Sequence, residues 1–168
     1  YYDQIDIDIG VSGLAGDPAY PVHADYPLPP LPLGKAGKRV AEAHNKLGWH
    51  WWPEPNAILS APYDGRNPCV QRGVCTSGCG EGAKASTDLT HWPKAIESGA
   101  KLITSARVRE ITINPKGLAT GAIWLDPDGN EFHQEADIVV LAANAIGTSR
   151  LLLLSESSLF PNGLANSS

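Results

Sequence analysis

The spacing of apolar residues predicts two short helices. From Lys35 to Leu47, apolar side chains recur at positions that share one helix face, and Gly48 stands where a helix C-cap is expected. A second helix is predicted over 88–98, ending before Gly99. Pro93 is compatible with this helix only in or near the first turn, because proline has no amide hydrogen. Both predictions therefore depend on a glycine or a proline as well as on apolar spacing.

Three short strands are predicted after these helices. Residues 102–114 are rich in β-branched side chains, and 119–126 and 130–136 have the same extended character. The last two are separated by Asp-Pro-Asp-Gly at 126–129, a turn of the kind that closes hairpins. The three segments therefore predict an antiparallel meander.

The run from Ile138 to Ala143 predicts a strand of another kind. It carries no polar side chain, whereas a strand with one face in water alternates between apolar and polar residues. This pattern is typical of a central strand in a parallel sheet. Small residues follow, and then a helix is predicted with Thr148 or Ser149 near its N-cap. The predicted fold class is α/β, with mixed α+β character.

The turn between this strand and this helix is the main candidate for a ligand site. Small residues allow a ligand to approach the backbone, and the first amides of a helix attract anionic or electron-rich groups such as those of a dinucleotide. The same residues also suit simple tight packing of a strand against a helix. The residue pattern leaves both interpretations open.

Composition narrows the class of protein. Of the 168 residues, 42% are hydrophobic, which is typical of a folded globular chain. The net charge of -5 is spread without a Lys/Arg block, which argues against binding to nucleic acid or to an anionic membrane. No apolar run reaches the roughly 18 residues that a membrane span needs. Neither an initiator Met nor a signal peptide begins the chain, so we expect an internal fragment. A fragment does not reveal its compartment, which stays open between cytoplasm and periplasm.

Three cysteines, Cys69, Cys75 and Cys79, lie in one glycine-rich loop. An odd number within one loop argues against a disulfide framework. Glycines let the backbone turn the sulfur atoms toward one point, which suits a metal centre. Reduced cysteines in a well-packed loop are the other interpretation. Zinc fits less well, because no fourth cysteine is near and His91 is the one further ligand within reach.

The aromatic segment around His50 allows two interpretations. Trp49, Trp51 and Trp52 can stack on the apolar face of a sugar, but at strand spacing they cannot all point the same way. At least one of them is therefore expected in the core. A structural role is favoured over substrate contact.

Several segments resemble, in order, the N-terminal region of the GMC (glucose-methanol-choline) oxidoreductases. ANAIGTSRLLLLS, at 143–155, resembles the second signature of that family. Three segments that precede this signature in the family are resembled, in order, by STDLTHWPKAI, GAKLITSARVREI and GLATGAIWLDPDG. The cysteine loop is most similar to the branch with gluconate, fructose and FAD-dependent glucose dehydrogenases. Asn144 stands where that signature usually has glycine; asparagine tolerates unusual backbone dihedrals, so the turn can still form.

The resemblance implies a domain organisation and a set of FAD contacts. It implies part of a substrate or cap region at 1–83 and a partial FAD-binding, Rossmann-like domain with a β-meander at 84–168. Val108 would offer backbone groups to the adenine. The FAD groove would be lined by Ala142, Ala143, Asn144, Ala145 and Thr148. The family's GxGxxG loop and catalytic His pair have no counterpart in this chain, so no catalytic residue is assigned and little FAD binding by the fragment alone is expected.

The resemblance also implies an activity for the parent protein. An alcohol, polyol, sugar or sugar acid would transfer hydride from its CH–OH carbon to flavin N5, and the electrons would pass to an acceptor other than oxygen. Cys69, Cys75 and Cys79 would hold a [3Fe-4S] cluster that delivers electrons to a cytochrome subunit. Two other classes of protein stay open as alternatives. An NAD(P)-dependent Rossmann oxidoreductase does not account for the meander, and a non-enzymatic carbohydrate-binding or electron-transfer module does not account for the run 138–143.

Overall fold

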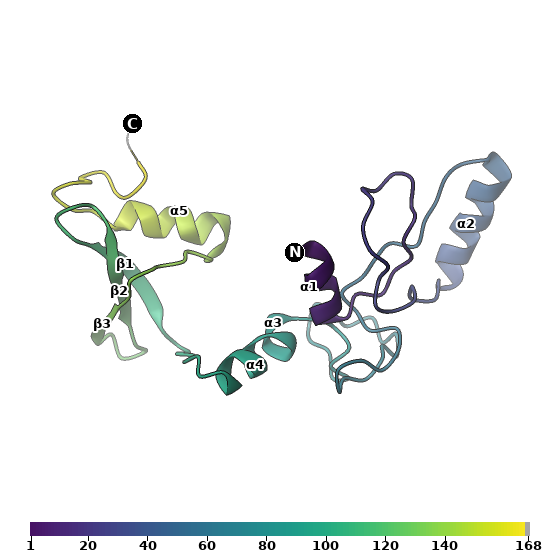
Figure 1. Cartoon of the computed structure of the whole chain (residues 1–168), viewed down its shortest axis with the longest axis horizontal. Helices are drawn as coiled ribbons and strands as arrows, with labels where there is room; N and C mark the ends of the chain where they lie inside the picture. Colours follow the sequence, from purple (N-terminus) through teal and green to yellow (C-terminus); the bar gives the residue numbers. More distant parts are fainter. Residues whose placement is uncertain (167–168) are drawn as a thin grey trace. The chain divides into compact units, whose positions relative to one another are not determined.

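The structure is a computed structural model that describes residues 1–166, in which the chain divides into two compact units, Tyr1–Ala100 and Lys101–Ser168 (Figure 1). The first unit contains the helices α1 (Tyr2–Ile9), α2 (Lys35–Leu47), α3 (Thr87–Thr90) and α4 (Trp92–Glu97). The second contains the strands β1 (Arg107–Ile113), β2 (Ala119–Leu125) and β3 (Glu131–Glu135), followed by helix α5 (Asn144–Leu154). The predicted division into a substrate region and a cofactor region after residue 83 stays a prediction.

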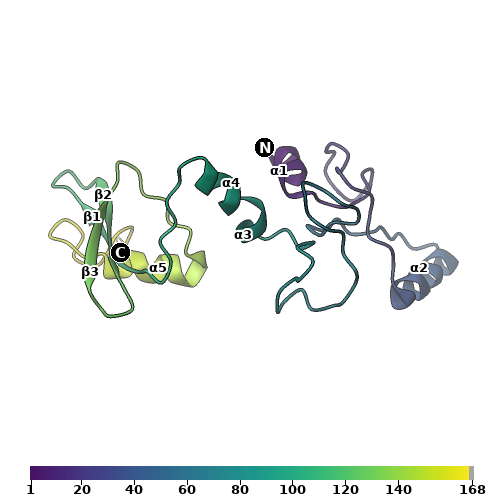
Figure 2. The ribbon, with the colours of Figure 1, turned by 90° about the horizontal axis from the view of Figure 1, so that it is seen from below.

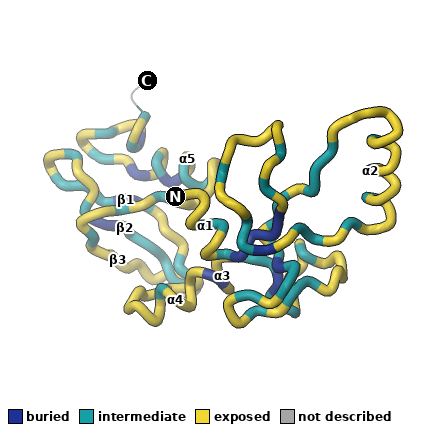
Figure 3. The backbone as a smooth tube through the Cα atoms, turned by 45° about the vertical axis from the view of Figure 1, so that its right-hand side comes forward, coloured by how far each residue is buried: buried dark blue, intermediate teal, exposed yellow. Residues whose placement is uncertain are grey.

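The N-terminal unit is built mainly of loops around a small core. Its buried cluster consists of Leu28, Leu59 and Ala83. Ser12 joins two loops: its backbone exchanges two hydrogen bonds with Asn56, and its hydroxyl donates to the carbonyl of nearby Ile58. Figure 3 shows the buried residues of this unit as short stretches within long exposed segments. The loops are therefore tied together at a few points rather than along a continuous sheet.

Helix α2 confirms the first predicted helix. It ends at Gly48, whose φ of 67° lies in the left-handed region and whose amide donates to Asn45 in the last turn. Glycine enters this region without a steric penalty, which is why it is the usual helix terminator. Of the residues of α2, only Ala41 is buried. No helix among the described residues is both long and apolar enough to cross a membrane.

The second predicted helix, 88–98, is wrong as one continuous element. The structure has two short helices, α3 and α4, which meet at His91. Pro93 lies at the start of α4, as the sequence required. A proline inside a continuing helix removes one backbone hydrogen bond and its ring overlaps the preceding turn. The helix therefore breaks before Pro93 and begins again.

The predicted meander is confirmed. The sheet has the order β1-β2-β3, and both neighbouring pairs are antiparallel. Asp126 shapes the turn between β2 and β3, since its Oδ1 accepts the amides of Asp128 and Asn130 at 2.9 and 2.8 Å. The first strand is shorter than the predicted segment 102–114.

Helix α5 packs on the sheet through β1 (Figure 2). Ile111 and Leu151 are buried where the two elements meet. Ser155, 2% exposed, accepts the Ile111 amide at 2.9 Å and donates to the Leu151 carbonyl at 2.8 Å. A single hydroxyl therefore links the end of the helix to the first strand.

The prediction of a central parallel strand at 138–143 is wrong. These residues form no strand, and Ile138 and Val140 are 81% and 82% exposed. A central strand needs hydrogen-bonded neighbours, and the one sheet among residues 1–166 is the antiparallel meander, which this run does not join. The mixed helix and strand content is confirmed. A Rossmann-like arrangement is not formed by the described residues.

Candidate functional site

The predicted ligand turn lies at the start of α5. The helix begins at Asn144, so the prediction that Thr148 or Ser149 caps it is wrong: both lie about one turn further in. Asn144 has a φ of 59°, and its Oδ1 accepts the Gly147 amide at 3.0 Å. Asparagine combines tolerance of the left-handed region with a short acceptor side chain, so it caps a helix amide where the family's usual glycine has no side chain.

The predicted cofactor-lining residues form an exposed strip at this turn. Residues 142–146 are all exposed, whereas Thr148 is half-buried. The first amides of a helix have no carbonyl partner within the helix and carry its positive partial charge. Small side chains, an accessible backbone and this charge fit one wall of a site for an anionic dinucleotide such as FAD.

Val108, the predicted adenine contact, lies on β1. It pairs with Trp124, its side chain is 40% exposed, and the register shifts between Val108 and Glu110. Because β1 is an edge strand, about half of its backbone groups face away from β2 and are available to a ligand. Within residues 1–166, no hydrogen bond joins Val108 to the turn at Asn144.

The cysteine loop surrounds a cavity of about 30 Å³ that all three cysteines line. The three thiols are free and half-buried. The Gln71 amide donates to Cys69 Sγ at 3.3 Å, and Lys84 Nζ donates to the Cys75 carbonyl at 2.9 Å. The cavity is about the size of one water molecule. The loop therefore brings the cysteines around one point without leaving room for a larger group.

Cys79 has the most distinctive electrostatic environment in this loop. The Lys84 amide, followed by further backbone amides at 81–83, donates toward its sulfur and lowers the pKa of the thiol. Amides that point at sulfur favour a thiolate. However, no group of three or more His, Cys, Asp or Glu side chains in the described part of the chain is arranged to hold a metal ion. As folded here, the three cysteines do not fit an iron–sulfur cluster.

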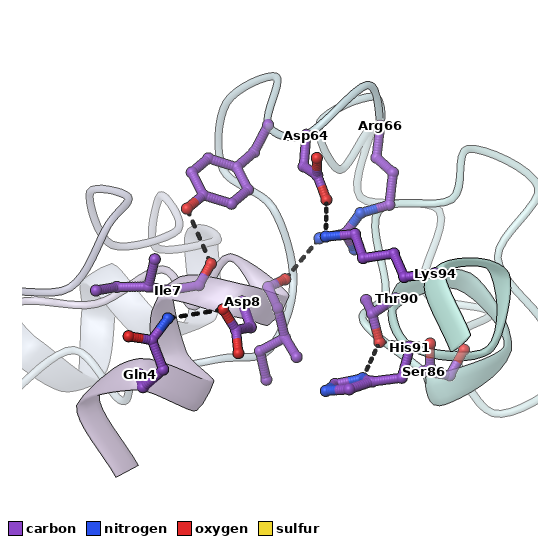
Figure 4. Close-up of polar contacts among 11 residues, drawn as sticks. Gln4, Ile7, Asp8, Asp64, Arg66, Ser86, Thr90, His91 and Lys94 are labelled. Atoms are coloured by element: carbon purple, nitrogen blue, oxygen red, sulfur yellow. Dashed lines mark hydrogen bonds and ion pairs between the residues drawn. The ribbon is translucent and has the colours of Figure 1, made fainter. Parts of the chain in front are cut away.

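A polar network around the C-terminus of α1 was missed by the sequence analysis (Figure 4). The Tyr63 hydroxyl donates to the Ile7 carbonyl at 2.8 Å, and Arg66 Nη2 donates to the Ile9 carbonyl at 2.6 Å. Both donors add a side-chain bond at the end of the helix, where the Ile7 carbonyl also accepts the Gly10 amide, and a cation is favourable at this end of the dipole. The signal for a helix was Gly10, its left-handed C-cap.

An ion pair connects α4 to the same network. Lys94 Nζ lies 2.8 Å from Asp64 Oδ2, and both side chains are about half exposed. The hydrogen bond from Lys94, followed by its charge, lowers the pKa of the Asp64 carboxyl. Exposed pairs of this kind contribute little to stability, so this contact positions α4 more than it stabilises the unit.

The tryptophan segment is anchored by its indole groups. Trp51 Nε1 donates to Asn45 Oδ1, and Trp52 Nε1 donates to the Leu14 carbonyl, both at 2.8 Å. These bonds agree with a structural role, but none of the three tryptophans is buried, so the expectation that at least one lies in the core is wrong. Trp49 is 62% exposed and lies edge-on to His44.

Comparisons with known proteins identify relatives over most of the chain. The family model described as GMC oxidoreductase matches residues 35–159. The chain is 45% identical over 99% of its length to 2-methyl-1,2-propanediol dehydrogenase of Mycolicibacterium austroafricanum. It is 34% identical over its whole length to the fructose dehydrogenase large subunit of Gluconobacter japonicus, and 31% identical over 79% to the gluconate 2-dehydrogenase flavoprotein of Pantoea cypripedii. The chain covers 30%, 31% and 23% of these relatives, so it spans a third or less of their length.

Proposed function

The chain belongs to the GMC oxidoreductase family, and from this premise we propose that it is part of an FAD-dependent enzyme that oxidises CH–OH groups. The observation that carries the proposal is the family match over 35–159, which includes the meander and the turn at Asn144. Family membership confirms the resemblance found in the sequence and implies FAD as the cofactor. Neither an NAD(P)-dependent Rossmann enzyme nor a non-enzymatic binding module accounts for this match.

The exposed strip before and within the start of α5 would hold part of the cofactor. Bound FAD would supply the hydride acceptor. Ala142, Ala143 and Ala145 have side chains too small to keep a ligand away from the backbone, and the first amides of α5 would attract its negative charge. Asn144 would hold the turn in shape through its bond to the Gly147 amide.

Two further residues complete the proposed contacts on this chain. Thr148 is half-buried one turn into α5, where its hydroxyl would bond a polar group of the cofactor. Val108 would contribute backbone groups from the open edge of β1 to the adenine. Neither role requires an ionisable side chain, which is consistent with a wall that binds and orients rather than transfers protons.

The names of the relatives support a substrate class. They refer to a branched diol, a sugar and a sugar acid, all of which carry oxidisable CH–OH groups. We propose the same class of small polyhydroxy compounds as substrates of the whole protein, with an acceptor other than oxygen. An electron-accepting partner such as a cytochrome is part of this proposal.

The absorption spectrum of the protein in its full natural length tests the proposal. We expect flavin bands that bleach when 2-methyl-1,2-propanediol, fructose or gluconate is added without oxygen. Replacing Thr148 by Val should weaken FAD binding several-fold, through the loss of one hydrogen bond, while Ser149→Ala serves as the matched control. A colourless protein, or a flavin that none of these compounds reduces, would contradict the proposal.

The iron–sulfur cluster is a separate prediction. It rests on the similarity of the loop with Cys69, Cys75 and Cys79 to the loop of the gluconate and fructose dehydrogenase branch, whereas the arrangement in the structure leaves no room for a metal centre. No electron-transfer step is therefore derived from it. Iron analysis of protein purified without oxygen should show iron that Cys75→Ser loses and Ser77→Ala keeps. Iron-free protein with full alcohol oxidation would favour reduced, structural cysteines.

A further inference from the structure

An open depression of about 460 Å³, with mostly exposed lining residues, lies along the N-terminal unit beside the proline-rich segment 17–34. Its volume is in the range of small-molecule sites. The residues that define its chemistry are Asp17, Pro18, Tyr20, Pro21, His23 and Asp25. None of them belongs to the proposed FAD wall or to the cysteine loop.

Two hydrogen bonds hold one carboxylate oxygen of Asp17, and the other oxygen is left for a ligand. Asp17 Oδ1 accepts the Ala19 amide and His50 Nε2, each at 2.9 Å, and the Asp17 side chain is only 13% exposed. The Ala19 amide, followed by His50, lowers the pKa of Asp17, so the carboxylate stays charged. Within the described residues Oδ2 has no hydrogen-bond partner. Asp17 therefore offers the depression a fixed, charged acceptor.

A second part of the lining, His23, is also held by hydrogen bonds. His23 Nδ1 lies 2.6 Å from the Ala24 carbonyl, which can only accept, so Nδ1 carries the hydrogen. In the neutral ring Nε2 then accepts the Tyr26 hydroxyl, at 3.1 Å. Pro18 and Pro21 restrict the backbone on the near side. A wall that is rigid before binding loses little entropy when a ligand arrives.

The lining selects a class of ligand. Asp17 and Asp25 accept hydrogen bonds, while the proline rings and Tyr20, which is 54% exposed, offer apolar faces. No Lys or Arg lines this depression among the described residues, which disfavours an anion. A metal ion is disfavoured because no group of ligands in the same residues is arranged for one. A ligand with hydroxyl groups on an apolar carbon frame can donate to the two carboxylates and pack against the proline rings and Tyr20.

We propose that this depression binds a neutral polyhydroxy compound, a polyol or a sugar, through the free carboxylate oxygen of Asp17 and the face of Tyr20. The choice of a polyol over other neutral hydrogen-bond donors rests on the proposed function. Binding itself needs no electron transfer. It can therefore be measured without turnover.

Equilibrium dialysis of radiolabelled sorbitol against the full protein tests the site, with the flavin reduced beforehand so that no oxidation occurs. Asp17→Asn is the sharpest variant, because its amide oxygen can still accept the Ala19 and His50 bonds while Oδ2 becomes a donor. We expect it to weaken sorbitol binding about tenfold or more, and Tyr20→Ala to weaken it similarly, at unchanged thermal stability. Asp128→Asn, on an exposed turn of the other unit, is the matched control and should bind as the unchanged protein does.

Sorbitol binding unchanged by both Asp17→Asn and Tyr20→Ala would overturn the inference. So would labelled Ca²⁺ binding in place of sorbitol with the same dependence on Asp17. The two proposals fail separately. If alcohols bleach the flavin but sorbitol binding does not depend on Asp17, only the proposed polyol site is contradicted. If sorbitol binding depends on Asp17 but the protein oxidises no alcohol, only the proposed enzyme activity is contradicted.

Discussion

The two units of this chain are stabilised in different ways. In the C-terminal unit, neighbouring strands repeat one hydrogen-bond pattern, and one buried hydroxyl, Ser155, attaches the helix. In the N-terminal unit, individual side chains such as Tyr63 and Arg66 each satisfy a separate carbonyl. Single substitutions should therefore have large effects at a few positions of the second unit and smaller effects at many positions of the first.

The largest expected effect is that of Gly121→Ala in β2. A Cβ at this position would overlap the carbonyl oxygen of Gln134 on β3, and backbone cannot move aside as a flexible side chain can. We expect the free energy of opening of the β2–β3 pair to fall by about 3 kcal/mol, measured by amide hydrogen exchange. Gly34→Ala, where a Cβ meets nothing within 4 Å, is the control. Unchanged protection of β3 would show that the meander is not a tightly constrained region.

Ser155→Ala should have the next largest effect. It removes two hydrogen bonds and leaves the buried Ile111 amide without its partner. Leaving a buried donor unsatisfied costs about 2 kcal/mol, which should appear as faster exchange in α5 and β1. Ser149→Ala, on an exposed position of the same helix, should change exchange little. Equal effects of the two variants would mean that the helix does not depend on this contact.

Tyr63→Phe tests the N-terminal unit, where we expect a smaller loss of stability than from Ser155→Ala. It removes the hydroxyl that donates to the Ile7 carbonyl and keeps the ring. The expected loss is about 1 kcal/mol, confined to α1, because the carbonyl keeps the Gly10 amide as a donor. Tyr2→Phe, on a residue that is 83% exposed, is the control. A loss larger than that of Ser155→Ala would reverse the difference drawn between the units.

The smallest expected effect is the pH dependence of the Asp64–Lys94 pair. The pKa of Asp64 is lowered in the folded state by Lys94. The pair therefore stabilises the unit above the ordinary carboxyl pKa, and this contribution is lost as the pH falls through the lowered value. Asp64→Asn should lower the thermal midpoint slightly near neutral pH, and this difference should shrink as the pH falls below the ordinary carboxyl pKa and also at high salt. A difference that persists in acid would exclude the ion pair as its cause.

The sequence predicted the elements that depend on neighbours along the chain. The helix ending at Gly48 and the hairpin turn at Asp126 are confirmed because their signals are local. The capacity of Asn144 to adopt unusual dihedrals was also anticipated and is confirmed by its positive φ. These are properties of single residues or of short spacings, so no knowledge of distant contacts was needed.

The wrong predictions depend on partners that a pattern does not identify. The apolar character of Ile138 to Ala143 was correctly noted, but burial requires a neighbouring strand, which the described residues do not provide. The N-cap was placed too late because Thr148 and Ser149 are commoner capping residues than a left-handed Asn144. Helix α1 was missed because its alternating Ile and Asp residues have the spacing of a strand. The roles of the FAD-lining residues and of the cysteines stay predictions.

The meander also determines the order in which this part of the protein can form during synthesis. Each of its strands pairs with the next one along the chain, and such short-range contacts form quickly. A growing chain can therefore complete the sheet as soon as β3 has left the ribosome, while α5 is still inside the exit tunnel. The exposed apolar run at 138–143 emerges immediately afterwards. We expect nascent chains in which this run has emerged, but α5 has not, to depend most on chaperones.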